Sequence, residues 1–196
     1  NNPAGDTGSS TTQSETSLAL NEVTGTICSG YNDSYHGVTQ GTGYAGFSRS
    51  TDGGATFTDR GSMNNSSCYG DPSIVWRKSD GYFYYATLFG SGLAMWRSTD
   101  DCTTFPYLGM IHSGGSDDKE LLAVDNNPSS PYYGRLYCVW TDFGAGQVIR
   151  STYSDNGTNW SSPVTLTSGS NPQGAWPAIA PNGDVYVSWA NGLFTG

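Results

Sequence analysis

The stretch Ser50–Phe57 reads STDGGATF, and close variants of it return twice along the chain. STDDCTTF occupies Ser98–Phe105, and YSDNGTNW occupies Tyr153–Trp160. The shared frame is a hydroxyl residue, a spacer, an Asp and a terminal aromatic, with Gly and Thr between them in most copies. This frame predicts a tight hairpin turn in which the Asp carboxylate accepts hydrogen bonds from amides of its own turn. We therefore expect three structural turns that each join two strands.

This repeated turn is called an Asp box, and a few residues in each copy have a structural role. The Asp closes the turn, a Gly adopts a positive φ at little cost, and the aromatic begins the returning strand. The residues in these roles are Ser50, Asp52, Gly54 and Phe57 in the first box, Ser98, Asp100 and Phe105 in the second, and Asp155, Gly157 and Trp160 in the third. Successive boxes lie roughly 50 residues apart, about the length of one four-stranded propeller blade.

Short apolar runs between turn residues predict an all-β fold, a β-propeller of four-stranded antiparallel blades with about three and a half blades present. The expected strands are 15–20, 26–31, 44–50 and 57–63 in blade 1; 71–76, 81–89, 93–98 and 105–111 in blade 2; 119–125, 135–143, 147–152 and 163–166 in blade 3; and 176–180 and 184–190 in a half blade spanning 176–196. Residues 1–14 are expected to be a flexible segment. Since no stretch sustains a 3.6-residue period, essentially no helix is expected.

The charge balance excludes two classes of partner. The chain has 17 acidic and 8 basic residues and a net charge of −9. Nucleic acids and anionic membranes bind clustered Lys and Arg, so neither is expected as a partner. No apolar run approaches the ~20 residues that span a bilayer, so membrane insertion is not expected either.

Four widely separated cysteines, Cys28, Cys68, Cys102 and Cys138, predict two disulfides in an exported protein. Cys102 replaces the Gly of its box and would face the next repeat, which favours pairing with Cys138. The alternative is buried free thiols, because Cys28 and Cys138 lie in apolar runs where Cys packs as a small apolar side chain.

Several phrases resemble a known family. The Asp boxes on a blade-length repeat resemble those of the BNR-repeat, sialidase-like β-propellers. Six stretches resemble secreted bacterial exo-α-sialidase-like proteins: QSETSLALN, GYNDS, SRSTDGGATF, GDPSIVW, DKELLAVD and VYVSWA. The resemblance implies a secreted protein that acts on or binds glycans. One fold hosts many chemistries, so the resemblance predicts the fold better than the activity.

The resemblance also implies where ligand binds. In such propellers ligand meets the starts of the first strands and the loops between second and third strands, on the face opposite the boxes. These positions hold Glu15, Asp71, Asp118, Lys119, Glu120 and Trp176 on the strands, and Asn32, Asp33, Tyr35, His36 and Asp142 on the loops. Asp71 and Glu120 are candidates for the two carboxyl groups of glycoside cleavage. Trp176 and Tyr35 offer flat faces to a sugar ring.

Two alternatives stay open for this acidic ring. The carboxylates could cap turns, or they could offer the oxygen ligands that suit Ca²⁺; apart from this, no metal or cofactor is expected. His36 fits a polar loop residue better than a catalyst.

Sialidases of this family hold the substrate carboxylate with three arginines, and this sequence departs from that pattern. The early arginine motif is missing, because the corresponding strand reads SETSLAL. Arg49, Arg97 and Arg150 precede the boxes and are expected on the other face, paired with neighbouring carboxylates. Whether the chain is an enzyme therefore stays open: one hypothesis is a glycoside hydrolase-like propeller, and the other is a non-catalytic extracellular scaffold or self-assembling subunit.

Three and a half blades do not close a ring, and closure removes exposed sheet edges. The last predicted strand would leave an apolar edge that recruits another chain. We expect either further blades of the same polypeptide or neighbouring copies to cover it.

Overall fold

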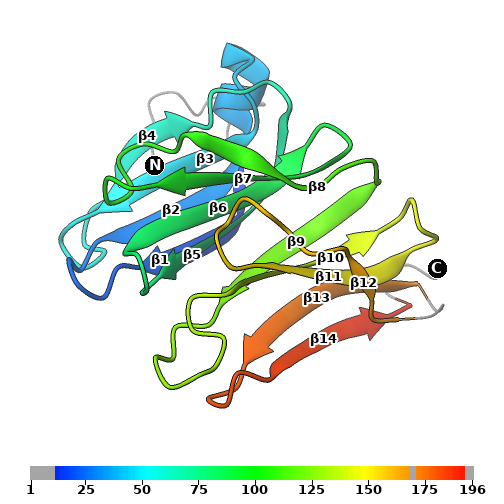
Figure 1. Ribbon diagram of the computed structural model, residues 1–196. Coiled ribbons are helices and arrows are strands. Elements are labelled where there is room, and N and C mark those ends of the chain that lie inside the picture. Colours follow the sequence, from blue (N-terminus) through cyan, green and yellow to red (C-terminus); the bar gives the residue numbers. More distant parts are fainter. Residues whose placement is uncertain (1–11, 168–170, 193–196) are drawn as a thin grey trace.

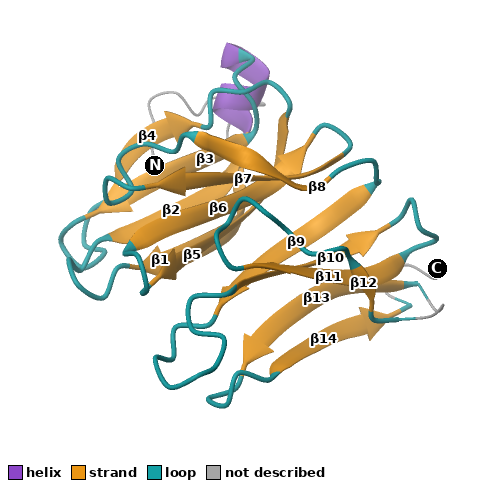
Figure 2. Ribbon diagram, viewed as in Figure 1, coloured by secondary structure: helices purple, strands orange, loops and turns teal. Residues whose placement is uncertain are grey.

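Three four-stranded antiparallel sheets and one two-stranded sheet succeed one another along the chain (Figures 1 and 2). The computed structural model describes residues 12–167 and 171–192. The strands are β1 (Gln13–Leu20), β2 (Ile27–Asp33), β3 (Ala45–Ser50) and β4 (Thr58–Ser62); β5 (Cys68–Arg77), β6 (Tyr82–Phe89), β7 (Gly92–Ser98) and β8 (Tyr107–His112); β9 (Asp117–Val124), β10 (Leu136–Asp142), β11 (Val148–Ser154) and β12 (Val164–Thr165); and β13 (Pro172–Ile179) and β14 (Val185–Asn191).

Each sheet is one blade, because its strands pair in chain order and each neighbour runs antiparallel. The first strands β1, β5, β9 and β13 lie side by side from blade to blade (Figure 1). The predicted fold class, all-β with about three and a half propeller blades, is confirmed. Residues 1–11 of the predicted flexible segment lie outside the described residues, whereas Gln13 and Ser14 already belong to β1.

The core fills the spaces between blades. Phe47, Tyr85 and Trp96 pack between blades 1 and 2, while Tyr84 and Trp140 pack between blades 2 and 3. Alternate residues of a strand face opposite sides of its sheet, so neighbouring Tyr84 and Tyr85 serve different cores. Each fully buried aromatic stabilises the fold by roughly 2–3 kcal/mol relative to an exposed one.

One short helix corrects the prediction of an essentially helix-free chain. Tyr35–Gln40 forms a single π-helical turn directly after β2. The Asp33 carboxylate accepts a hydrogen bond from the His36 amide at 3.0 Å, which stabilises a local turn that no periodic pattern reports. Among the described residues, no helix has the length and apolar character to cross a membrane.

The first two repeated turns have the predicted hydrogen bonds. In the first, Asp52 Oδ1 accepts from the Thr56 amide at 2.9 Å and from the Ser50 hydroxyl at 2.8 Å. Asp100 likewise accepts from the Thr104 amide at 2.9 Å. Hydrogen bonds from the Thr56 hydroxyl and amide lower the pKa of Asp52 to about 2.

The third turn corrects the assignment of its acidic residue. Asn156, not Asp155, accepts from the amides of Thr158 and Asn159, at 2.9 and 2.8 Å. Asp155 instead forms an ion pair with Arg135 at 2.7 Å. Ser154 lies one residue closer to Gly157 than Ser50 lies to Gly54. The position of the accepting side chain therefore falls on Asn156 rather than on Asp155.

The cysteine pairing also differs from the prediction. Cys28 and Cys102 form a disulfide with Cα atoms 5.9 Å apart, whereas Cys68 and Cys138 are free and buried. The second repeated turn packs back onto blade 1, where Arg49 donates to the Asp101 carbonyl at 2.6 Å. Cys102 therefore meets the preceding blade rather than the following one, and a second disulfide is absent from the described residues.

Candidate functional site

A cavity of about 530 Å³ opens where the first strands of all four sheets meet. Its walls come from β1, β5, β9 and β13. The lining residues that carry polar or aromatic groups include Glu15, Asp71, Lys119, Glu120 and Trp176. Five residues predicted from the sequence are thus brought together from four blades.

A bulge at the same place in each first strand positions these side chains. The register with the second strand shifts beside Glu15, Asp71, Lys119 and Gly174. Their φ angles are 53°, 53°, 54° and 68°, which is the left-handed region. Non-glycine residues rarely adopt it, and such strain concentrates at functional sites. The bulge redirects the three charged side chains, and a Gly fills the fourth position.

The three charged side chains contact one another. Lys119 Nζ forms an ion pair with Glu15 Oε2, and Glu15 also shares a hydrogen bond with Asp71. Asn32 on β2 supports the group, because its Oδ1 accepts from the Asp71 amide at 2.6 Å and its Nδ2 donates to Asp71 Oδ1 at 3.4 Å. The charges are therefore held in one fixed arrangement.

The environment separates the two carboxyl groups in acidity. Burial, together with the hydrogen bond to Glu15, raises the pKa of Asp71 to about 7. The hydrogen bond from Asp71 lowers the pKa of Glu15 against the opposing effect of burial, and Lys119 adds to the lowering. The pair shares one proton near neutral pH, and Asp71 is the residue that holds it.

Glu120 lines the same cavity and is 1% exposed. Apart from a contact with its own backbone amide, neither carboxylate oxygen has a hydrogen-bond partner. Burial raises the pKa of Glu120 well above its ordinary value. Burial therefore favours the protonated form of this side chain, and an unpartnered buried carboxyl group is uncommon enough to suggest a functional role.

Trp176 lies at the cavity, and the remaining predicted residues lie outside its lining. Trp176 is 64% exposed at the cavity, whereas Asp118 accepts a hydrogen bond from Gln173 at 2.9 Å and does not line it. Tyr35 and His36 border a separate shallow depression near the helical turn. Asp142 lies away from the cavity, in contact with Arg150.

No arginine is among the described residues that line the cavity. Arg49 pairs with Asp101 and Arg150 with Asp142, as the sequence predicted for neighbouring carboxylates. Arg97 instead lies over the ring of Tyr82, 5.4 Å from its centroid. No local sequence pattern indicates the bulges, because a bulge is defined by pairing with another strand.

Solved structures with a similar fold include enzymes that are named for their action on carbohydrates. An α-L-arabinanase from Penicillium chrysogenum, complexed with arabinobiose, is similar over 90% of this chain and 57% of the arabinanase chain, with 15% sequence identity and a TM-score of 0.71. An α-L-arabinofuranosidase from Fusarium graminearum matches 90% over 55% of its own chain, at 16% identity and a TM-score of 0.66. A Hadza microbial sialidase matches 76% over 32% of its own chain, at 14% identity and a TM-score of 0.51.

The chain spans little more than half the length of the two arabinan-related structures and about a third of the sialidase. No protein-family model and no curated protein sequence matches it. At these identities the likeness establishes the β-propeller fold and leaves the activity to the site itself.

Proposed function

We propose that the protein is an extracellular, glycan-acting β-propeller that cleaves glycosidic bonds at the cavity between its first strands. The observation that carries the proposal is the Glu15–Asp71 pair, whose pKa values the environment moves apart beside an exposed Trp176. Separated acidities within a carboxyl pair are typical of acid–base catalysis. Glycoside hydrolases among the structural neighbours support the same class of reaction.

Asp71 would act as the general acid. With its pKa raised to about 7, it retains a proton near neutral pH and can donate it to the glycosidic oxygen. Ionised Glu15, paired with Lys119, accepts the hydrogen bond that holds the Asp71 carboxyl group in place. Trp176 would stack on the apolar face of the sugar.

The second carboxyl group must come from elsewhere, because carboxyl groups that flank a scissile bond lie at least about 5 Å apart. Hydrogen-bonded Glu15 and Asp71 are too close to serve on opposite sides. Glu120 is our candidate, since it lines the same cavity without a partner. Substrate hydroxyls or water that donate to Glu120 would favour its ionised form.

The charges at the cavity favour a neutral sugar. Among the residues that the structure describes, its lining has a single cation, Lys119, which already pairs with Glu15, and no arginine that could bind a sugar carboxylate. A sialic acid would place its negative charge beside Glu15. We therefore propose a neutral glycoside as substrate, carried on a propeller of the BNR, Asp-box type, rather than a sialoside.

A panel of aryl glycosides, including arabinofuranosides, galactosides and sialosides, tests the proposal. Turnover of a neutral substrate should fall by about 100-fold or more in Asp71→Asn, as expected for loss of a general acid, and should also fall in Glu120→Gln. The control is Glu22→Gln, since Glu22 is an exposed acid that pairs with Lys78 away from the cavity. Equal activity of Asp71→Asn and the native protein would refute the assignment.

A non-catalytic glycan-binding scaffold is the second candidate function, favoured by the closeness of Glu15 and Asp71. It predicts no turnover of any substrate but binding of an oligosaccharide that Trp176→Ala weakens. Calorimetry on the native protein and this variant separates binding from inactivity.

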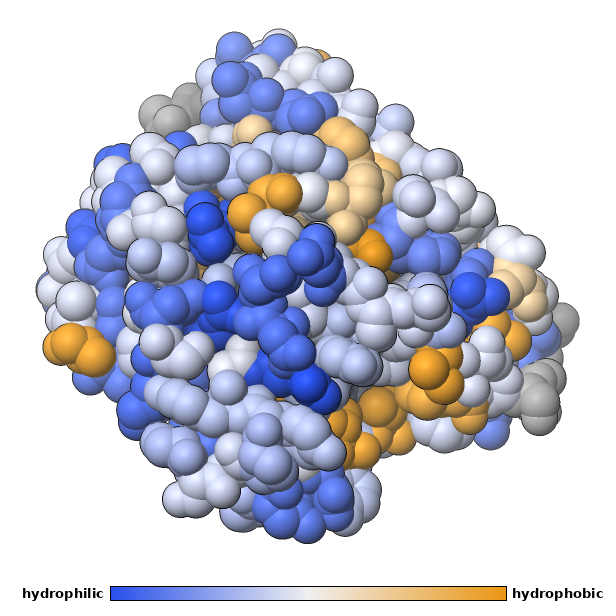
Figure 3. Space-filling view, viewed as in Figure 1, coloured by the Kyte–Doolittle hydropathy of each residue, from blue (hydrophilic) through white to orange (hydrophobic). Residues whose placement is uncertain are grey.

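We also infer that the free edge of β14 associates with another strand. Within the described residues β14 pairs only with β13, and it exposes Tyr186 and Trp189. Figure 3 shows hydrophobic residues over the region where Figure 1 places these two strands. Further blades or neighbouring copies would suit such an edge. Light scattering tests this, since a stable monomer of these 196 residues at high concentration would contradict it.

A further inference from the structure

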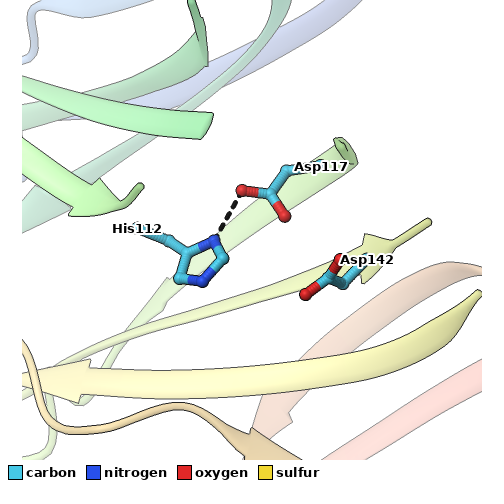
Figure 4. Close-up of side chains that lie close together, drawn as sticks. All are labelled: His112, Asp117 and Asp142. Carbon is cyan, nitrogen blue, oxygen red and sulfur yellow. Dashed lines mark hydrogen bonds and ion pairs between the residues drawn. The ribbon is translucent and has the colours of Figure 1, made fainter. Parts of the chain in front are cut away.

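A second cluster of polar side chains joins blades 2 and 3 away from the cavity. His112 is the last residue of β8, Asp117 begins β9, and Asp142 ends β10 (Figure 4). One potential ligand atom from each residue lies within 4.8 Å of the others. None of the three lines the cavity of the proposed glycan site.

Two of these groups are carboxylates placed opposite each other and removed from water. Asp117 and Asp142 are register partners in the β9–β10 ladder. Their side chains are 0% and 4% exposed. Two buried carboxylates on directly paired strand positions repel each other unless a cation lies between or beside them.

The surrounding groups hold the carboxylates in fixed orientations. Trp140 Nε1 donates to Asp117 Oδ1 at 2.9 Å, and the Ala145 amide donates to Asp142 Oδ1 at 2.9 Å. Arg150 Nε lies 3.1 Å from Asp142 Oδ2. With His112 neutral, two carboxylates and one guanidinium leave one net negative charge. Such supporting contacts are those that orient ligands around a bound metal ion.

Asp117 Oδ2 is free of the tryptophan contact and lies 2.6 Å from His112 Nδ1. These two atoms are within hydrogen-bonding distance of each other. In a tetrahedral zinc site with Zn–N and Zn–O bonds of about 2.0 Å, two ligand atoms are ~3.3 Å apart. Asp117 Oδ2 and His112 Nδ1 would therefore separate by less than about 1 Å to hold an ion, and Asp142 offers a third ligand atom within 4.8 Å of both.

Blade 1 supplies a comparison within the same chain. Asp33 ends β2 as Asp142 ends β10, and Asp33 lies 2.6 Å from His36, whereas the histidine contact of blade 3 is made by Asp117. The register partner of Asp33 is Gln13, whereas that of Asp142 is Asp117. Blade 1 thus has the His–Asp pair without a second carboxylate. The added acid makes the blade 3 arrangement a three-ligand set.

We propose that His112, Asp117 and Asp142 bind a divalent first-row transition-metal ion such as Zn²⁺, which clamps blade 2 to blade 3. One imidazole and two carboxylates suit this class better than Ca²⁺, which takes oxygen ligands alone. The ion balances the buried carboxylates, and its bonds cross between blades because His112 belongs to the sheet before Asp117 and Asp142.

The test is Zn²⁺ titration of the chelator-treated full chain by calorimetry, with thermal unfolding as a second readout. The native protein should bind one equivalent of Zn²⁺, and its Tm should rise with added metal. His112→Gln and Asp117→Asn should each bind at least about 10-fold more weakly and lose the metal-dependent rise in Tm. The matched control, Asp33→Asn, alters the His–Asp pair of blade 1 and should bind as the native protein does.

Both ligand variants keep a hydrogen-bonding side chain of similar size, and their circular dichroism without metal reports whether they fold. If a ligand variant does not fold, the native titration and the Asp33→Asn control still decide the matter. No saturable Zn²⁺ binding by the folded native protein would overturn the proposal and leave the cluster an internal ion-pair network. Unchanged affinity in folded His112→Gln would also overturn it, because the ion would then bind at other residues.

Discussion

The Cys28–Cys102 disulfide gives the sharpest prediction about stability. It joins β2 of blade 1 to the second repeated turn of blade 2 across a sequence separation of 74 residues. In the chain-entropy treatment, closing a loop of this length lowers the entropy of the unfolded chain and so raises the free energy of unfolding by about 4 kcal/mol. For a chain of this size, that difference corresponds to a Tm change of roughly 8–16 °C.

The perturbation is the double replacement Cys28→Ala with Cys102→Ala, compared with the native protein with and without reductant. The double variant and the reduced native protein should lose similar stability in guanidinium unfolding, and reductant should not destabilise the variant further. Cys138→Ala is the control, since Cys138 is buried and free; its response to reductant should match that of the native protein.

Alkylation of the unfolded, unreduced chain gives an independent measurement. Two thiols should react, those of Cys68 and Cys138, and the intact mass should be lower by two hydrogens than that of the reduced chain. Four reactive thiols, or an unfolding midpoint insensitive to reductant, would refute the reasoning.

The remaining predictions concern the third turn, the acidic pair and the cavity. Asn156→Ala should destabilise the protein by about 0.5–1.5 kcal/mol, because two exposed turn amides lose their acceptor. Asp155→Ala removes an exposed ion pair and should cost less than Asn156→Ala. Urea unfolding of both variants checks the order, and the reverse order would restore Asp155 as the turn residue. Because Asp71 binds its proton more tightly in the folded protein, the free energy of unfolding should fall as pH rises from about 4 to about 7. The Asp71→Asn variant should lack this contribution to the pH dependence. Identical pH profiles of unfolding for the variant and the native protein would contradict the raised pKa. Trp176→Ala should weaken glycan affinity by about 5-fold or more without a change in Tm, because Trp176 is mostly exposed, and calorimetry with an oligosaccharide tests this.

The sequence by itself determined the fold class and the order of strands. Apolar runs, such as Tyr82–Phe89, and turn residues, such as Ser50 and Asp52, act through neighbours a few positions away. Such interactions are visible in one stretch of chain. The blade-length spacing of the repeated turns then indicated a propeller, and it also placed Glu15, Asp71 and Trp176 near the starts of first strands.

Only the tertiary structure decided which of these residues act together. Lys119 meets Glu15 across 104 residues because both occupy bulges in first strands that meet at the cavity, and a bulge exists only relative to a partner strand. The cysteine pairing depends on which blade the second repeated turn packs against, and this turn packs against the preceding blade rather than the next. His112 joins Asp117 and Asp142 for the same reason: contacts between blades depend on how sheets pack, and packing is a property of surfaces that are distant in sequence.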